Sequence, residues 1–174
     1  MVPSLRGSSS IGYAHLHPHR LRECGRWKAR PWRRPGWSPR DGCISCALLY
    51  EIPKKFPRLR FGFLEAGSTW VPYVVDRLMA EQKRRQWVRR FELGADLFRS
   101  NRLFVAVDPV EDISHLLELG TEDSLMIGSD YTHFDTSAQP DALVQVRDWV
   151  EEGRISEVVG RKILEDNPSA FFGF

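Results

Sequence analysis

The chain has 174 residues, of which 42% are hydrophobic and 28% are charged, with a net charge of +2, a composition typical of one globular domain. No apolar run approaches the roughly 18 residues that a membrane-spanning helix needs, and no apolar stretch follows the first basic residue as in a secretory signal, so we expect a cytoplasmic protein with no membrane partner. Three cysteines are few, and their number is odd, so we expect no disulfide framework. This favours the same compartment.

The charge is unevenly distributed along the chain. Residues 1–40 hold nine Lys/Arg and one Glu, whereas residues 41–174 hold sixteen Lys/Arg and twenty-two Asp/Glu. The first part is rich in Arg, Pro, Trp and Gly and follows neither a helical nor a strand period. We therefore predict an irregular, disordered arm at 1–41 and a folded domain at 42–174. The enrichment in Arg, Pro, Trp and Gly stops where the domain begins. Residues 1–41 could therefore equally be a leader that is unrelated to the domain.

Two motifs in or beside this arm suggest sites on spacing alone. Residues 15–19 read His-Leu-His-Pro-His and could supply two metal-binding imidazoles, but no apolar strand precedes them, so a flexible His-rich tail is favoured. Cys43 and Cys46 form a Cys-x-x-Cys without a second pair, and we favour a small core residue at Cys46 over half of a zinc site. The arm's tryptophans could stack on bases, but no recognisable module accompanies them, so we expect no nucleic-acid partner.

From Pro53 onward, strands and helices alternate. The run "RLRFGFLEAG" predicts a buried strand, and Ser68 or Thr69 can cap a following helix. The run "RLFVAVD" predicts a second strand, with Asp108-Pro109 starting a helix that Gly120 ends. The predicted inward residues of these two helices are Val71, Val74, Val75, Leu78, Ile113, Leu116 and Leu117.

The third strand opens the stretch "SLMIGSDYTHFDT", residues 124–136. A helix starting at Pro140 and stopping at Gly153 follows it, and Ser156 caps a last helix that ends at Asn167-Pro168. The predicted inward residues of the two helices are Leu143, Val146, Trp149, Val150, Ile163 and Leu164.

Three strands that alternate with helices indicate a parallel α/β sheet, because parallel neighbours need a crossover connection. Each strand is followed by an acid, namely Glu65, Asp108 and Asp130. Ligands of α/β folds bind beyond the carboxyl ends of the strands. We therefore expect these acids at one face of the sheet, where a carboxylate can hold a metal or move a proton.

Three segments, "FPRLRFGFLEAGSTWVPYVVDRL", "LMIGSDYTHFD" and "ILEDNPSAFFGF", resemble the last three β/α units of the amidohydrolase-related metal-dependent hydrolases and decarboxylases. The resemblance covers roughly residues 43–174 and implies the C-terminal part of a TIM-like (β/α)₈ barrel. It also implies that Asp130 is a metal ligand and proton acceptor, with His133 in the loop near the site. A divalent metal, most often zinc, and a small-molecule substrate are implied in the same way.

Some positions depart from the family's pattern. Thr132 replaces the usual proline of the Gly-Ser-Asp-Tyr-Pro-His segment, and Glu65 stands where decarboxylase-like members carry a histidine. A full barrel takes about 250 residues, so we expect a truncated form with an incomplete metal site that needs self-association or a related subunit. The alternatives are a non-catalytic interaction protein derived from the barrel and a non-oxidative decarboxylase. Asp135 fits a turn or cap equally well.

Overall fold

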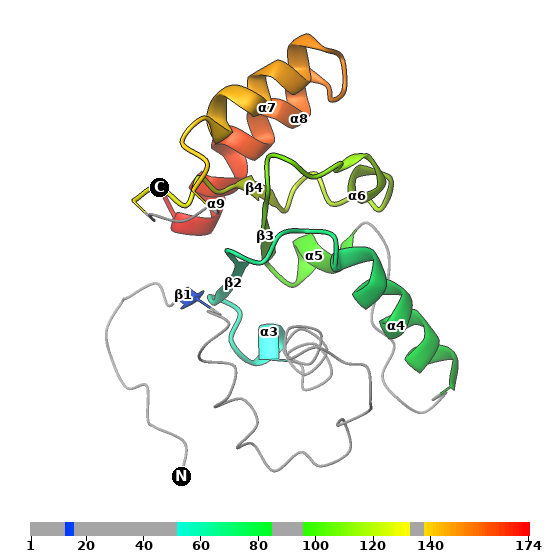
Figure 1. Ribbon diagram of the computed structural model, residues 1–174. Coiled ribbons are helices and arrows are strands. Elements are labelled where there is room, and N and C mark those ends of the chain that lie inside the picture. The colour runs from blue at the N-terminus through cyan, green and yellow to red at the C-terminus, as the bar shows by residue number, and fades with distance from the viewer. Residues whose placement is uncertain (1–12, 16–51, 85–95, 133–137) are drawn as a thin grey trace.

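The computed structural model describes residues 13–15, 52–84, 96–132 and 138–174 (Figure 1). Four strands form one parallel sheet in the order β1 (Tyr13–His15), β2 (Arg60–Phe63), β3 (Leu103–Val107) and β4 (Leu125–Ile127). The register aligns Phe61 with Leu103 and Val105 with Leu125. The predicted parallel α/β class is therefore confirmed.

Helices connect and cover these strands. Their bounds are α3 (Ile52–Lys55), α4 (Val71–Arg84), α5 (Asp96–Ser100), α6 (Ser114–Glu118), α7 (Ala142–Glu151) and α8 (Glu157–Arg161), followed by the π-helical turn η2 (Lys162–Asp166) and α9 (Asn167–Phe172). In Figure 1, α4 and the paired helices α7 and α8 lie toward opposite ends of the sheet. No helix in the described part of the chain is both long enough and apolar enough to cross a bilayer.

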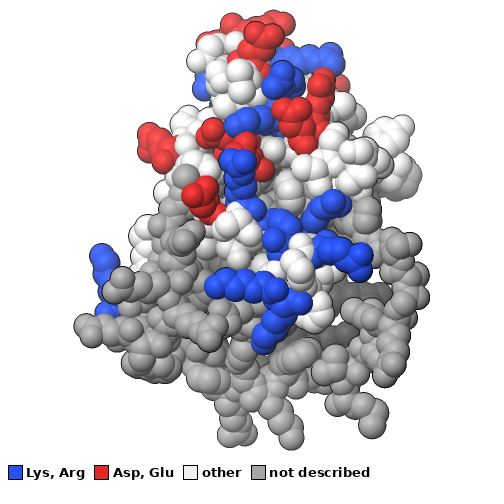
Figure 2. Space-filling model, turned by 180° about the vertical axis from the view of Figure 1, so that it is seen from behind, with Lys and Arg blue, Asp and Glu red and all other residues white. Residues whose placement is uncertain are grey.

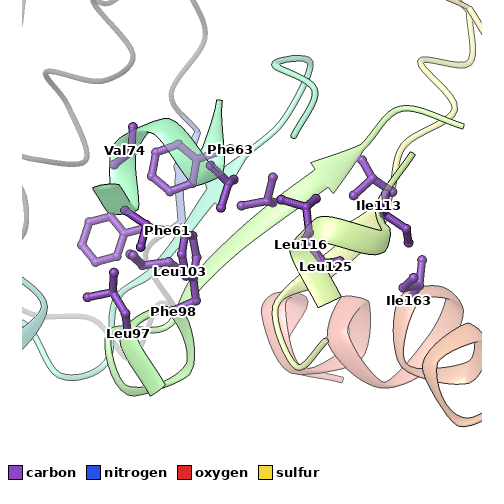
Figure 3. Close-up of a cluster of buried hydrophobic side chains, with 14 of the residues drawn as sticks. Phe61, Phe63, Val74, Leu97, Phe98, Leu103, Ile113, Leu116, Leu125 and Ile163 are labelled. Carbon is purple, nitrogen blue, oxygen red and sulfur yellow. The ribbon is translucent and has the colours of Figure 1, made fainter. Parts of the chain in front are cut away.

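The main core lies on one face of the sheet. Alternate residues of β3 point to opposite faces, so Leu103, Val105 and Val107 face the larger cluster while Phe104 faces a smaller one. Figure 3 shows members of the larger cluster, with side chains from β2, β3, β4, α4, α5, α6 and η2 and from Ile113 directly before α6. The helical members of the larger cluster are Val71, Val74, Val75, Leu78, Leu97, Phe98, Leu116, Val146, Trp149 and Ile163, with Ile113 and Ile155 from the linkers.

The opposite face of the sheet is covered by the end of the chain. Phe171 of α9 is 2% exposed, and its ring centroid lies 5.4 Å from that of Phe104. Met126 and the partly buried Leu64 complete this smaller cluster. A Cβ atom at Gly62 would lie 2.5 Å from the Phe171 ring, so β2 passes this ring only because residue 62 has no side chain.

Most of the predicted inward positions are confirmed, but Leu143 was predicted wrongly. It is 51% exposed, because α7 buries Ala142, Val146 and Trp149 and so turns the position next to Ala142 toward solvent. The predicted stops at Gly120 and Gly153 are confirmed, since both glycines have left-handed backbone angles directly after their helices, with φ of 70° and 73°.

Two helix boundaries differ from the prediction. The helix after β3 begins at Ser114, not at Asp108, because an Asp108 carboxylate oxygen accepts the Val110 backbone N–H and forms a turn. The last helix continues past Pro168 to Phe172. The wider π-helical turn that precedes Pro168 gives its ring room where a regular α-helix would bring it against a carbonyl.

Within the predicted N-terminal arm, the structure describes residues 13–15. Tyr13–His15 forms β1 and pairs with β2, a strand that the sequence did not predict within the irregular arm. The other arm residues, including His17 and His19, lie outside the described residues, as do Cys43, Cys46, His133 and Asp135. The division into an arm and a domain stays a prediction.

Charged side chains of both signs share the surface around α7 and α8. Figure 2 shows acidic groups gathered at the end of the molecule that these helices occupy, with basic groups among and below them. The exposed acids of this part are Asp148, Glu151, Glu152 and Glu157, and the exposed arginines are Arg147, Arg154 and Arg161. Such an intermixed pattern is typical of a solvated face.

Candidate active site

The candidate site lies at the carboxyl edge of the sheet, where the loops after β2, β3 and β4 emerge. Because all the strands are parallel, these loops share one edge. Glu65 follows β2, Asp108 follows β3 directly, and Asp130 follows β4. The structure therefore places the three predicted acids at the predicted edge of the sheet, and Glu65 is exposed while Asp108 and Asp130 are half-buried.

Backbone strain is concentrated in these loops. Glu65, Asp130 and Thr132 adopt left-handed backbone angles with φ of 54°, 47° and 82°, a region that non-glycine residues rarely occupy. Arg102 also has a positive φ, of 55°, but it precedes β3 at the opposite edge of the sheet. Non-glycine residues in this region cluster at functional sites of proteins.

Arg102 has a structural explanation for its strained backbone. Its guanidinium donates to the carbonyl oxygen of Leu59 over 2.9 Å and to that of Pro53, and so ties α3 to β2 and β3. The loops after β2 and β4 hold the other strained residues, and both carry candidate acids. Strain at the carboxyl edge therefore coincides with the predicted site.

The loop after β4 contains Thr132, at the position where the resemblance described above implies a proline. A proline has φ near −65°, so the φ of 82° at Thr132 is one that a proline at this position could not adopt. Ser129 shapes the same loop, since its hydroxyl accepts the Tyr131 backbone N–H over 3.3 Å and its carbonyl oxygen accepts the Gln139 N–H over 2.7 Å. A proline at this position would therefore require a different path of the loop directly after Asp130.

The residue that sequence reasoning missed is Glu111. Its carboxylate accepts hydrogen bonds from the Ser68 N–H over 2.9 Å, the Ser68 hydroxyl over 2.6 Å and the Thr69 N–H over 3.3 Å. It also accepts the Asp108 N–H over 3.0 Å. Ser68, predicted as a possible helix cap, thus directs its hydroxyl to Glu111, and one carboxylate joins the loops after β2 and β3.

The electrostatics of Glu111 follow from these contacts. Burial raises the pKa of its carboxyl group, but the hydrogen bonds from Ser68, Asp108 and Thr69 outweigh burial and bring the pKa below its ordinary value of 4.5. The carboxylate is therefore the stable form at neutral pH. The spacing Asp108-x-x-Glu111 is a capping-box signature that could have indicated the contact with Asp108. No sequence motif around Glu111 indicates its contact with Ser68, which lies 43 residues away in the sequence.

The described residues do not by themselves fit a divalent metal. Within them, no group of three or more His, Cys, Asp and Glu side chains is close enough to hold an ion, whereas zinc sites take at least three protein ligands. Asp130 lies inside the described part, and His133 lies outside it. A complete metal site at this edge would need ligands from beyond the described residues.

Comparison with known proteins identifies the family. The amidohydrolase family profile matches residues 43–174, which is more than half of the chain. The chain therefore belongs to the amidohydrolase family. No curated protein matches it with significance.

A solved structure agrees with this assignment at the level of the fold. An amidohydrolase from Mycobacterium avium subsp. paratuberculosis K-10 is 21% identical and superposes with a TM-score of 0.63. The match covers 78% of this chain and 33% of that protein, so this chain spans about a third of the length of the solved relative.

Proposed function

We propose that the chain is the C-terminal portion of an amidohydrolase-type barrel and that Asp130 serves hydrolysis at its carboxyl edge. The observation that carries this proposal is the strained backbone of Asp130, with φ of 47°, in the loop after β4. It coincides with the family's Gly-Ser-Asp segment, so motif and geometry select the same residue independently. In this role the Asp130 carboxylate accepts the proton of a water molecule that attacks a carbonyl or imine carbon of a small-molecule substrate.

The proposed site is incomplete within the described residues. Asp130 lacks the neighbouring ligands that a divalent metal such as zinc would require there. Glu65 and His133 are proposed as residues near the site that shape it without completing it. The remaining ligands would have to come from residues beyond the described part or from another chain.

The outer strands of the sheet also favour association with a second polypeptide chain. Among the described strands, β1 and β4 are the edges and carry a neighbour on one side only. Unpaired edges of a parallel sheet expose backbone donors and acceptors that normally find partners. We propose that a second copy or a related subunit with the missing strands closes the fold.

The second candidate function is that of a non-catalytic interaction protein derived from the barrel. The absence of a ligand group among the described residues favours it, as does the altered loop at Thr132. In this case Asp130 is a residue inherited from an ancestral metal site. Decarboxylation is less well supported, because Glu65 occupies the position that carries histidine in decarboxylase-like relatives.

The metal content of the full chain separates these candidates. Elemental mass spectrometry would be applied to untagged protein purified without chelator, in the wild type, Asp130→Asn and the control Asp112→Asn, which changes an exposed acid after β3. About one zinc or manganese per chain, lost only in Asp130→Asn, would support the hydrolase, and hydrolysis of amide and ester libraries would then be measured. Metal retained in Asp130→Asn would contradict a role for Asp130, and no metal in any sample would favour the interaction protein.

A further inference from the structure

Glu111 occupies a position between two loops of the candidate site. Its two carboxylate oxygens receive four donors from two separate segments, Ser68 and Thr69 in the last part of the β2–α4 connection and Asp108 directly after β3. Hydrogen bonds to a charged acceptor are shorter and stronger than those between neutral groups. The contact is therefore a charge-assisted link between loops about forty residues apart in the sequence, as the separation of 43 between Ser68 and Glu111 indicates.

The residues next to the Glu111 carboxylate, Gly67 and Ser68, are suited to binding it. Ser68 is fully buried, so in the folded protein its hydroxyl and N–H have the Glu111 carboxylate as their acceptor in place of water. Gly67 has a left-handed φ of 61°, and a Cβ atom there would lie 2.6 Å from Glu111 Oε1. The loop can therefore approach the carboxylate this closely because residue 67 is glycine.

The same loop is held on its other side by Trp70. The indole Nε1–H donates to the Gly67 carbonyl oxygen over 2.8 Å, and the indole ring meets Phe63 of β2 edge to face with centroids 5.4 Å apart. Glu111 and Trp70 thus hold Gly67 and Ser68 from two directions. Glu65 lies two residues before Gly67, at the end of β2 that this arrangement fixes.

We infer that Glu111 is a positioning residue of the candidate site, whose carboxylate fixes the loop after β2 against the loop after β3 and so sets where Glu65 stands relative to Asp108. The importance of this position for hydrolysis rests on the proposed function, but the positioning itself does not. Glu111 does not act on substrate in this scheme. It acts through the two loops that it joins.

The test uses the full chain and the indole N–H signal of Trp70 in a nitrogen-15 correlation spectrum, assigned by its loss in Trp70→Phe. Glu111→Gln keeps the size of the side chain but removes its charge and presents an amide to the four donors. Glu111→Ala removes the acceptor of all four donors. The matched control is Glu118→Gln, which changes an exposed glutamate of α6.

We expect the Trp70 signal to shift or broaden in both Glu111 variants and to stay in place in Glu118→Gln. We further expect acetate, a carboxylate small enough for the vacated position, to return the signal of Glu111→Ala toward that of the wild type, which chloride at equal ionic strength would not do. A global loss of packing would not be reversed selectively by a carboxylate. Glu111→Asp, one methylene shorter, is expected to restore the signal only in part.

The inference would be overturned by an unchanged Trp70 signal in Glu111→Gln. It would also be overturned by acetate leaving the signal of Glu111→Ala where it was, provided the variant's far-ultraviolet circular dichroism shows a folded protein. Neither readout needs a substrate, so each stays informative if the chain hydrolyses nothing. Conversely, hydrolysis by the wild type together with an undisturbed loop in Glu111→Gln would leave the proposed function standing and remove the positioning role.

Discussion

Asn167 donates to the carbonyl oxygen of Leu125 through its side-chain amide over 2.7 Å, and so joins the start of the last helix to the start of β4. The same amide nitrogen donates to the Glu122 carbonyl oxygen over 2.7 Å. Asn167 is only 4% exposed. The amide therefore satisfies backbone acceptors that water does not reach, at the outer strand of the described sheet.

Replacing Asn167 by Ala is expected to lower the free energy of unfolding by about 2–3 kcal/mol, because two backbone carbonyls lose their donor and one of these bonds is buried. Urea unfolding followed by circular dichroism measures this. The control is Asn101→Ala, which removes hydrogen bonds from the side-chain amide to the Leu97 carbonyl oxygen at a half-buried position and to the Ser100 hydroxyl at an exposed one, and should cost about 1 kcal/mol or less. Equal losses in the two variants would contradict the special role of Asn167.

Acid should weaken the fold in part through Glu111. Its pKa in the folded state is lower than the ordinary 4.5, so the stabilisation is fully present above pH 4.5 and is lost as the pH falls from there through the folded-state pKa. The urea midpoint of the wild type should therefore fall more steeply below pH 4.5 than that of Glu111→Gln. Glu118→Gln serves as the control and should follow the wild type. Parallel curves for all three proteins would show that Glu111 is not the group that titrates.

Gly62→Ala is expected to destabilise the protein by about 1–3 kcal/mol, because the new methyl group meets the buried Phe171 ring at 2.5 Å and forces the small cluster to repack. Gly128→Ala is the matched control, since its methyl group would make an ordinary 3.6 Å contact with Ala106. Thermal unfolding of both variants measures the difference. Gly62→Ala combined with Phe171→Leu should recover part of the loss, and a double variant no better than the single one would argue against this clash.

Lys162 links η2 to the segment before β4. Its ammonium lies 2.7 Å from Asp123 Oδ1 and 3.4 Å from Glu122 Oε1, and the hydrogen bond to Asp123 contributes most to raising its pKa. Lys162→Met should cost about 1 kcal/mol at low salt and less at high salt. The control Arg161→Met breaks a more exposed pair with Asp166, 3.3 Å long, and should change stability by close to zero. A loss in Lys162→Met that does not depend on salt would point to packing instead.

Strands β2, β3 and β4 were predictable because each is an apolar run between residues that interrupt regular structure. The run from Leu103 to Val107 is buried throughout, as expected for a parallel strand covered on both faces. The stops at Gly120 and Gly153 were predictable for a local reason too, since glycine accepts the left-handed backbone that ends a helix. Predictions that rested on apolar runs and on glycine at helix ends therefore agree with the structure.

The errors arose where tertiary contacts override local signals. Asp108 looked like a helix cap, but its backbone N–H binds Glu111 and its side chain forms a turn with Val110. Pro168 looked like a helix end, but the preceding π-helical turn and the contacts of Asn167 keep the chain helical. β1 and the link from Glu111 to Ser68 depend on residues far apart in the sequence, which periodicity does not report.

The candidate site was predictable only in part. The acids at the strand ends could be named from the order of elements, and the strained backbone of Asp130 and Glu65 gives them a physical distinction that the sequence alone does not contain. Whether other ligands join them depends on segments beyond the described residues. The sequence could indicate the edge of the sheet, but not which side chains meet across it.

The cover that α9 provides has a consequence for biosynthesis. Phe171 packs on Phe104 and Met126, which lie in strands that precede α9 in the chain and are therefore synthesised before it. While α9 is still inside the ribosome, this side of the sheet lacks the ring that shields it, and exposed apolar surface of this kind invites chaperone binding or aggregation. Proteolytic loss of α9 would likewise leave the sheet with an open hydrophobic face.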